Sequence, residues 1–109
     1  MRVAGTGCWL PARVLGNAEA AALAGVTEEW IVRRTGIRER RVAADGEGAA
    51  AMSAHAARAA LASAAIAADA LGAVIVATTT PDHLTPPTAC ELQAELGAWG
   101  AACFDVEAG

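Results

Sequence analysis

The chain has 109 residues, of which 55% are apolar and 4% aromatic, and its formal net charge is −4 at pH 7. Because much of the apolar fraction is alanine, the predicted core is thin for an independent unit and fits a piece that packs against more protein. All eight basic residues are arginines on an acidic chain, which argues against general nucleic-acid binding, and no apolar run or leader predicts a membrane span or signal peptide.

The N-terminal segment opens with a short apolar run, Val3 to Gly7, which predicts a strand that ends before Pro11. A short helix is expected next. Asn17 is its candidate N-cap, and Gly25 is placed to end it after Ala24.

A second helix is predicted directly afterwards. Thr27 is its candidate N-cap, and Glu28 and Glu29 lie in the first turn, where carboxylates complement the helix dipole. Gly36 marks its end. Residues 37–42 then alternate imperfectly between apolar and polar, which predicts an irregular strand.

The longest predicted helix runs from Ala49 to about Ala68, because alanine dominates this stretch and has the highest helix propensity. After Gly72, the sequence AVIVATTT at residues 73–80 is continuously apolar and rich in β-branched residues. Such a run is typical of a central strand in a parallel sheet.

The C-terminal part predicts one more helix and one more strand. Pro87 suits the start of a helix that continues to Leu96 and ends at Gly97. Cys103–Val106 predicts a final buried strand, followed by a turn at residues 107–109. Helices that alternate with buried strands indicate an α/β fold with parallel neighbours, and no repeat, linker or domain boundary is evident.

The motif GTGCWL at residues 5–10 begins like a dinucleotide-binding loop. Its third glycine is missing, and a proline follows where a helix should open. We therefore interpret it as a tight turn rather than a nucleotide site.

Trp30 and Arg34 stand four residues apart on a predicted helix, and so on one face. Such a pair can stack a flat base and hold a phosphate, because arginine forks onto phosphate and tryptophan offers a large π surface. The pattern alone favours an amphipathic surface pair, or an ion pair of Arg34 with Glu28 or Glu29. Five of the eight arginines lie between residues 33 and 41. This cluster is explained equally by a solvated surface and by a binding site for an anionic ligand.

Asp82 beside His83 suggests general-base chemistry, but no nucleophile lies near them in the sequence. The simpler interpretation is a loop histidine. His55, within the alanine-rich helix, is expected to be a surface or packing residue.

The three cysteines are odd in number, far apart and without C-x-x-C spacing. Neither a disulfide framework nor a zinc or other metal site is expected, and a reducing cytoplasm is the default location. Cys8 and Cys90 are interpreted as small buried thiols rather than nucleophiles.

At EEWIVRRTGIRERR, residues 28–41, the sequence closely resembles the β-ketoacyl-acyl carrier protein synthase III family, whose members share the thiolase fold. Further matches follow in the same order and spacing: GTGCWLP at 5–11, VIVATTTPDHLTPPTAC at 74–90, LQAELGA at 92–98 and FDVEAG at 104–109. The resemblance implies a layered α/β/α/β/α thiolase-like fold, of which residues 1–109 form an incomplete first half and the N-terminal third of a subunit.

In that family, the strand matching Phe104–Val106 runs into a short turn and then the nucleophilic cysteine. The resemblance thus places the nucleophile directly after Gly109 and no catalytic residue within the chain. The implied enzyme is an acyltransferase that loads an acyl-CoA primer and condenses it with malonyl-acyl carrier protein, to begin fatty-acid or polyketide synthesis. A coenzyme A thioester is then a substrate, and no permanently bound cofactor is implied.

By position, Trp30 and Arg34 match family residues that stack on the CoA adenine and contact its phosphate-bearing end. Thr85 matches a position that is often phenylalanine and that reaches the acyl pocket of the neighbouring subunit in a homodimer. The smaller threonine implies a primer longer or bulkier than acetyl. Glu107 departs from the small residues usual before the nucleophile, which implies a raised thiol pKa or a specialised member.

Two alternatives stay open at this stage. One is a variant that keeps the fold but transfers the acyl group to a hydroxyl or amine without condensation. The other is a non-catalytic chain, either a fragment or a structural partner that supplies Thr85 and the CoA-side helix to another subunit.

Overall fold

The computed structural model describes residues 1–107. Ala108 and Gly109, and with them most of the predicted turn, lie outside the described residues. The chain forms two compact units, Leu10–Asp45 and the remainder. No shift in composition marks either junction, so the sequence showed no boundary there.

The unit of residues 10–45 holds two helices and an antiparallel pair of strands. Strand β1 (Arg13–Gly16) pairs with β2 (Glu39–Val42), with Arg13 opposite Val42. Helices α1 (Asn17–Ala24) and α2 (Glu28–Thr35) lie between them in the chain. The predicted strand at 37–42 is confirmed for its last four residues, whereas β1 was not predicted because four residues show too little alternation.

Local capping fixes α2 as predicted. The Thr27 Oγ1 accepts a hydrogen bond from the Trp30 amide at 3.2 Å, and Gly36 ends the helix with φ 71°. The predicted cap of α1 is wrong. Asn17 is the first helical residue, and its Nδ2 donates to the Ile37 carbonyl at 2.8 Å, so this side chain ties α1 to the segment before β2.

The larger unit contains the long helix and a parallel pair of strands. Its elements are α3 (Ala49–Ala64), a short 3-10 helix (Ala68–Ala70), β3 (Ala73–Ala77), α4 (Thr88–Leu96) and β4 (Ala102–Val106). Helix α3 ends four residues earlier than predicted, because Ala65 adopts a left-handed conformation with φ 54°. Strand β3 ends at Ala77, so the three threonines that follow belong to a loop.

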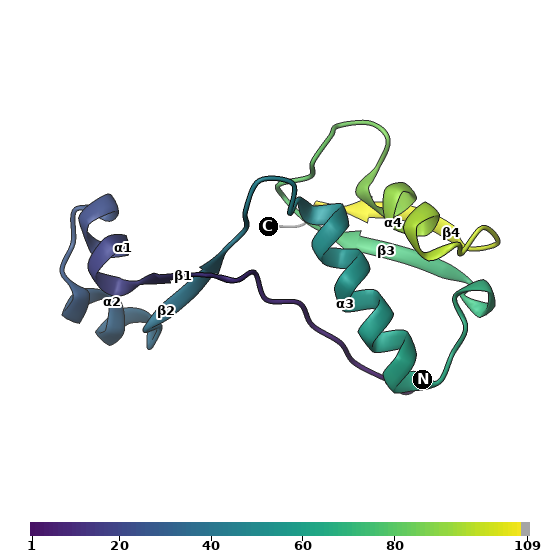
Figure 1. The fold of residues 1–109 in the computed structure, drawn as a ribbon, viewed down its shortest axis with the longest axis horizontal. Coiled ribbons are helices and arrows are strands. Elements are labelled where there is room, and N and C mark those ends of the chain that lie inside the picture. The colour runs from purple at the N-terminus through teal and green to yellow at the C-terminus, as the bar shows by residue number, and fades with distance from the viewer. Residues whose placement is uncertain (108–109) are drawn as a thin grey trace. The chain divides into compact units, whose positions relative to one another are not determined.

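Strands β3 and β4 are parallel neighbours, as predicted, with Val74 opposite Cys103. Helix α4 packs on both strands and α3 packs on α4 (Figure 1). Val74, Val76, Ala89 and Leu92 are among the residues that this packing buries. Ile75 and Phe104 point away from the core and remain 57% and 48% exposed, so the sheet keeps an open apolar face.

The strand predicted at residues 3–7 is wrong. The segment is not paired with any strand of residues 1–107, and a strand needs a neighbour to complete its hydrogen bonds. It runs instead against α3. A Cβ atom on Gly5 or Gly7 would overlap the α3 backbone around Ala60, so glycine permits this close approach.

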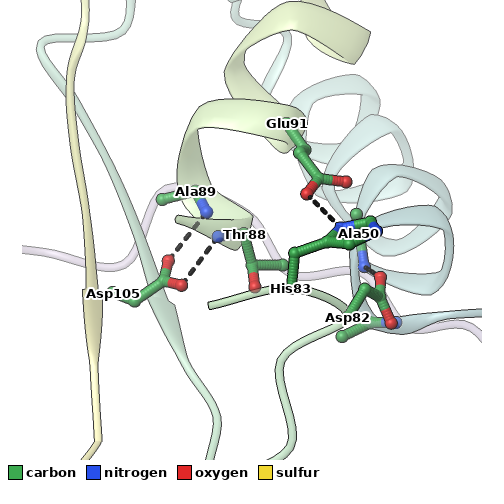
Figure 2. A network of polar contacts seen from close by, with 8 residues as sticks. Ala50, Asp82, His83, Thr88, Ala89, Glu91 and Asp105 are labelled. Atoms are coloured by element: carbon green, nitrogen blue, oxygen red, sulfur yellow. Dashed lines mark hydrogen bonds and ion pairs between the residues drawn. The ribbon is translucent and has the colours of Figure 1, made fainter. Parts of the chain in front are cut away.

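The N-terminus of α4 is capped by a carboxylate from β4. The two Asp105 oxygens accept hydrogen bonds from the Thr88 and Ala89 amides, both at 2.7 Å (Figure 2). Pro87, predicted to begin the helix, occupies the cap position, where its lack of an N–H leaves nothing unsatisfied. Helix α4 is thereby fixed in register on the sheet.

The N-terminus of α3 is capped in the same way by a distant residue. Asp82 accepts hydrogen bonds from the amides of Ala49 at 2.8 Å and Ala50 at 2.9 Å. Gly48 leaves room for this carboxylate, since a Cβ there would overlap it. The pKa of Asp82 lies below its ordinary value, chiefly because the Ala50 and Ala49 amides donate to the charged form.

We expect Asp82→Asn to lower the free energy of unfolding of the intact protein by about 1 kcal/mol at neutral pH, since it weakens a helix cap. A lowered folded-state pKa stabilises the protein above the ordinary carboxyl pKa, and this stabilisation is lost as pH falls through the folded pKa. The difference between wild type and variant should therefore shrink in acid. Denaturant unfolding across pH measures it.

Asp69→Asn is the matched control, because the exposed Asp69 side chain has no hydrogen bond or ion pair with any side chain or amide of residues 1–107. A pH-independent difference between Asp82→Asn and wild type would contradict the role of the carboxylate.

Candidate functional site

Helix α2 brings Trp30 and Arg34 together on an exposed face. The Arg34 guanidinium carbon lies 5.8 Å from the centre of the Trp30 ring, within the range of a cation–π contact. Trp30 is 43% exposed. None of the ion pairs within residues 1–107 involves Arg34. The alternative prediction of an ion pair with Glu28 or Glu29 is therefore wrong. The indole and guanidinium are both accessible to a ligand.

Two of the five arginines predicted to form a positive patch around α2 hold backbone carbonyls. Arg41 donates to the Pro11 carbonyl at 3.0 Å, and Arg40 lies 3.5 Å from the Leu15 and Gly16 carbonyls. These two arginines therefore serve the β1–β2 segment. Arg33, Arg34 and Arg38 are the exposed remainder of the cluster.

Asp82 and His83 do not form a catalytic dyad. The Asp82 carboxylate caps α3, whereas His83 Nδ1 lies 3.0 Å from the Glu91 Oε1 of α4 (Figure 2). His83 is a loop histidine, as the simpler interpretation held. Its contact and the Asp82 cap attach the loop between β3 and α4 to both helices.

Thr85 lies in the same loop, between these attachments and the capped start of α4. Its side chain is exposed, as is that of Leu84, at 92%. The structure thus presents Thr85 on the surface of the larger unit, on a loop that Asp82 and His83 hold before it and Asp105 holds after it.

The carboxyl ends of β3 and β4 meet at one edge of the sheet. The Thr78 amide donates to the Val106 carbonyl at 3.2 Å, and a hollow of about 330 Å³ lies over this edge. It is lined by Ala77, Thr78, Thr79, Thr80 and Val106. Parallel sheets collect ligands beyond the carboxyl ends of their strands. Glu107, which follows β4, is exposed, and the position after Gly109 lies outside the described residues.

The cysteines lie differently from what their spacing suggested. Cys8 is exposed, so its predicted burial is wrong; within residues 1–107 its segment pairs with no strand that would cover it. Cys90 is half-buried, and its Sγ lies 2.9 Å from that of Cys103. The pKa of the Cys90 thiol is raised, chiefly by its hydrogen bond to Cys103 and also by burial. His55 is exposed on α3, as the expected surface or packing residue, and stacks on Trp9 with ring centres 4.2 Å apart.

Sequence reasoning missed the roles of Asp82 and Asp105. Asp105 carried a usable signal, because a charged residue in the middle of an otherwise apolar strand needs a partner. Asp82 carried none, since aspartate is common in loops. Residues 1–107 contain no group of three or more side chains placed to hold a metal ion. Within the same part of the chain, every helix is too short or too polar to cross a membrane.

Comparison with known proteins adds sequence relatives that cover nearly the whole chain. No protein-family model matches it. It is 49% identical over 107 residues to the acetoacetyl CoA synthase NphT7 of Streptomyces. The aligned region covers 98% of this chain and 32% of that relative. It is 51% identical over 108 residues to a β-ketoacyl-[acyl-carrier-protein] synthase III of Thiobacillus denitrificans. This alignment covers 98% of this chain and 34% of the relative.

Solved structures agree with these sequence relatives. The 3-oxoacyl-[acyl-carrier-protein] synthase III of Aquifex aeolicus superposes with a TM-score of 0.90 at 41% identity, over 98% of this chain and 34% of its own. The priming β-ketosynthase of the R1128 polyketide pathway superposes with a TM-score of 0.90 at 40% identity. The match covers 98% of this chain and 32% of the ketosynthase. The chain spans about one third of the length of these relatives. Over that third, the chain matches β-ketoacyl-[acyl-carrier-protein] synthase III proteins in sequence and shares their thiolase-type fold.

Proposed function

We propose that this chain is the primer-binding part of a condensing enzyme that takes an acyl group from acyl-CoA and joins it to malonyl-acyl carrier protein. The observation that carries the proposal is 51% identity to a synthase III over 98% of the chain, together with the shared fold. We also propose that the enzyme is a homodimer, acts in the cytoplasm and needs no bound cofactor.

The proposed nucleophile is a cysteine at the position after Gly109. The proposal is supported by the end of β4 at the carboxyl edge of the sheet, beside the Thr78–Thr80 loop. There a thiolate attacks the thioester carbonyl and expels coenzyme A. Loss of carbon dioxide from the malonyl thioester then supplies the enolate, which attacks the acyl-enzyme and releases the thiolate. The Glu107 carboxylate, two residues before Gly109, is proposed to raise the pKa of this thiol, because a nearby negative charge disfavours the thiolate.

Trp30 and Arg34 are proposed to hold the nucleotide end of the acyl-CoA. Their contact leaves an exposed indole face for the adenine and guanidinium donors for a phosphate. The Thr27 cap and Gly36 fix the two ends of α2, so Trp30 and Arg34 both lie within the helix and on the same side of it. This binding is remote from the reacting carbonyl, so it contributes affinity rather than chemistry.

Thr85 is proposed to border the acyl pocket of the neighbouring subunit. It is exposed on a loop that is attached at both ends, so its position is defined while its side chain is free to meet another chain. A threonine leaves more room than the phenylalanine it replaces in the family pattern. The proposed primer is therefore longer or bulkier than acetyl.

A second candidate concerns the acceptor. The 49% identity to an acetoacetyl CoA synthase favours a reaction whose acceptor is a malonyl group on coenzyme A rather than on a carrier protein. The chemistry at the cysteine is the same in both cases. The group that carries the product differs, and an acetoacetyl product would use an acetyl primer in place of the longer primer proposed from Thr85.

The test of the proposed function uses the intact protein that carries these residues. We expect β-ketoacyl product when an acyl-CoA is mixed with malonyl-acyl carrier protein, detected by mass spectrometry of the carrier. Product only with malonyl-CoA would select the second candidate. Acyl transfer to a hydroxyl or amine, or no turnover with either malonyl donor, would overturn the proposal.

We expect Trp30→Ala and Arg34→Ala each to raise the KM for acyl-CoA by about tenfold, because each removes roughly 1–2 kcal/mol of binding to the nucleotide end. The kcat at saturating acyl-CoA should stay within about twofold, since the lost contact is remote from the chemistry. Steady-state kinetics with varied acyl-CoA measure both.

Arg38→Ala is the matched control, because Arg38 is an exposed arginine of the same cluster outside the Trp30 contact. Equal increases in KM for Arg34→Ala and Arg38→Ala would point to a general charge effect. An unchanged KM for acyl-CoA in both Trp30→Ala and Arg34→Ala would contradict the proposal that CoA binds to this face of α2.

We expect Thr85→Phe to shift primer preference toward acetyl-CoA, because the larger ring fills the space left for a longer chain. The ratio of kcat/KM for a longer or branched acyl-CoA to that for acetyl-CoA should fall about tenfold. Thr85→Ser should leave the ratio unchanged. A uniform loss of kcat/KM for all primers would place Thr85 outside the acyl pocket.

A further inference from the structure

Two cysteines far apart in the sequence lie in contact in the larger unit. Cys90 is the third residue of α4 and Cys103 the second of β4, and their Sγ atoms are 2.9 Å apart. Both are half-buried thiols. We propose that Cys90 and Cys103 are a modification site, a thiol pair that oxidises reversibly to a disulfide joining α4 to β4.

The geometry needs little adjustment. A disulfide bond is about 2.05 Å long, so the two sulfurs must approach by only about 1 Å, which small side-chain rotations supply. The backbones are already held next to each other. Asp105 bonds the start of α4 to β4, and Gln93 Nε2 donates to the Ala101 carbonyl at 2.7 Å. Oxidation would therefore join elements that already pack, without unfolding either.

The surrounding hydrogen bonds describe the reduced resting state. The Cys103 thiol lies 3.6 Å from Gln93 Oε1 as a donor, which leaves the Cys90 thiol to donate to Cys103. This bond is the main reason why the Cys90 pKa is raised, so Cys90 rests as a thiol and not as a nucleophilic thiolate. The pair is distinct from the cysteine proposed after Gly109.

The proposed oxidant is a low-molecular-weight disulfide such as oxidised glutathione. One cysteine thiolate attacks it, forms a mixed disulfide and releases one glutathione thiol. The second cysteine then attacks the protein sulfur of that mixed disulfide, forms the Cys90–Cys103 bond and releases the second glutathione. Both protein thiols lose their protons, two electrons pass to glutathione, and a dithiol reductant reverses the sequence.

The position of the pair sets what oxidation would change. Cys90 lies in the first turn of α4, just after the loop that carries Thr85, and Cys103 lies in the strand that leads to the proposed nucleophile. The disulfide would hold this loop end and this strand together under oxidising conditions. It would also remove both thiols from further, irreversible oxidation.

The sequence allows a direct test on the intact protein. Residues 59–109 contain no arginine or lysine, so trypsin would leave both cysteines on one peptide, but Glu91 and Glu95 lie between them. After incubation with oxidised glutathione at mildly alkaline pH and alkylation of free thiols, a glutamate-specific protease should release a linked pair of peptides. Reduction should separate them.

We expect the linked pair to account for most of both cysteine peptides in the wild type and in Cys8→Ser, and to be absent from Cys90→Ser and Cys103→Ser. In these two variants the remaining cysteine should be alkylated or carry one glutathione. The proposal is overturned if wild-type Cys90 and Cys103 are each alkylated or glutathionylated singly, or if either is linked to a different cysteine. The wild-type result stands even where a serine variant fails to fold.

Discussion

Both helices of the larger unit are fixed at their N-termini by carboxylates that come from other parts of the chain. Asp82 takes the first amides of α3, and Asp105 those of α4. Neither helix has a side-chain cap of its own, since Gly48 and Pro87 occupy the cap positions. Backbone N–H groups at a helix start have no partner within the helix, and a carboxylate there also meets the positive end of the helix dipole. The Asp105 contact sets the register of α4 on the sheet, and the Asp82 contact ties the start of α3, which packs on α4, to the loop between β3 and α4.

The same two carboxylates organise the surface proposed to work on the acyl chain. The loop from β3 to α4 is held at Asp82, which binds the start of α3, and at Thr88, whose amide binds Asp105. Thr85 lies between these two contacts. Asp105 also belongs to the strand whose carboxyl end opens onto the hollow beside Thr78. A change in the Asp82 cap would therefore disturb the loop that carries Thr85, and a change in the Asp105 cap would disturb both that loop and β4.

Local features were predictable from the sequence, and long-range ones were not. Thr27 and Gly36 bound α2 by capping rules that act within a few residues. The β-branched run at 73–77 forms a parallel strand as expected, but only Val74 and Val76 are buried, so the predicted burial of the whole strand is wrong for residues 1–107. The strand predicted at residues 3–7 failed because strand formation depends on a neighbour, which local sequence does not report. Asn17 failed as a cap because a distant carbonyl, that of Ile37, holds its side chain instead.

The candidate site shows the same division. A spacing of four residues on a helix was enough to bring Trp30 and Arg34 together, yet only the resemblance to synthase III suggested a CoA ligand for them. The contact of Cys90 with Cys103 joins a helix to a strand across 13 residues, and no spacing rule predicts it. Asp105 was signalled only as a charge in an apolar strand, without its partner.

Acylation of the intact protein bears most directly on the proposal that this chain leads into an acyl-accepting thiol. The protein that carries these residues is incubated with an acyl-CoA, and its intact mass is compared before and after treatment with hydroxylamine, which cleaves thioesters. We expect the gain of one acyl group per chain, removed by hydroxylamine and mapped to the residue after Gly109. A protein that gains no acyl group, or gains one elsewhere, would contradict the proposed function.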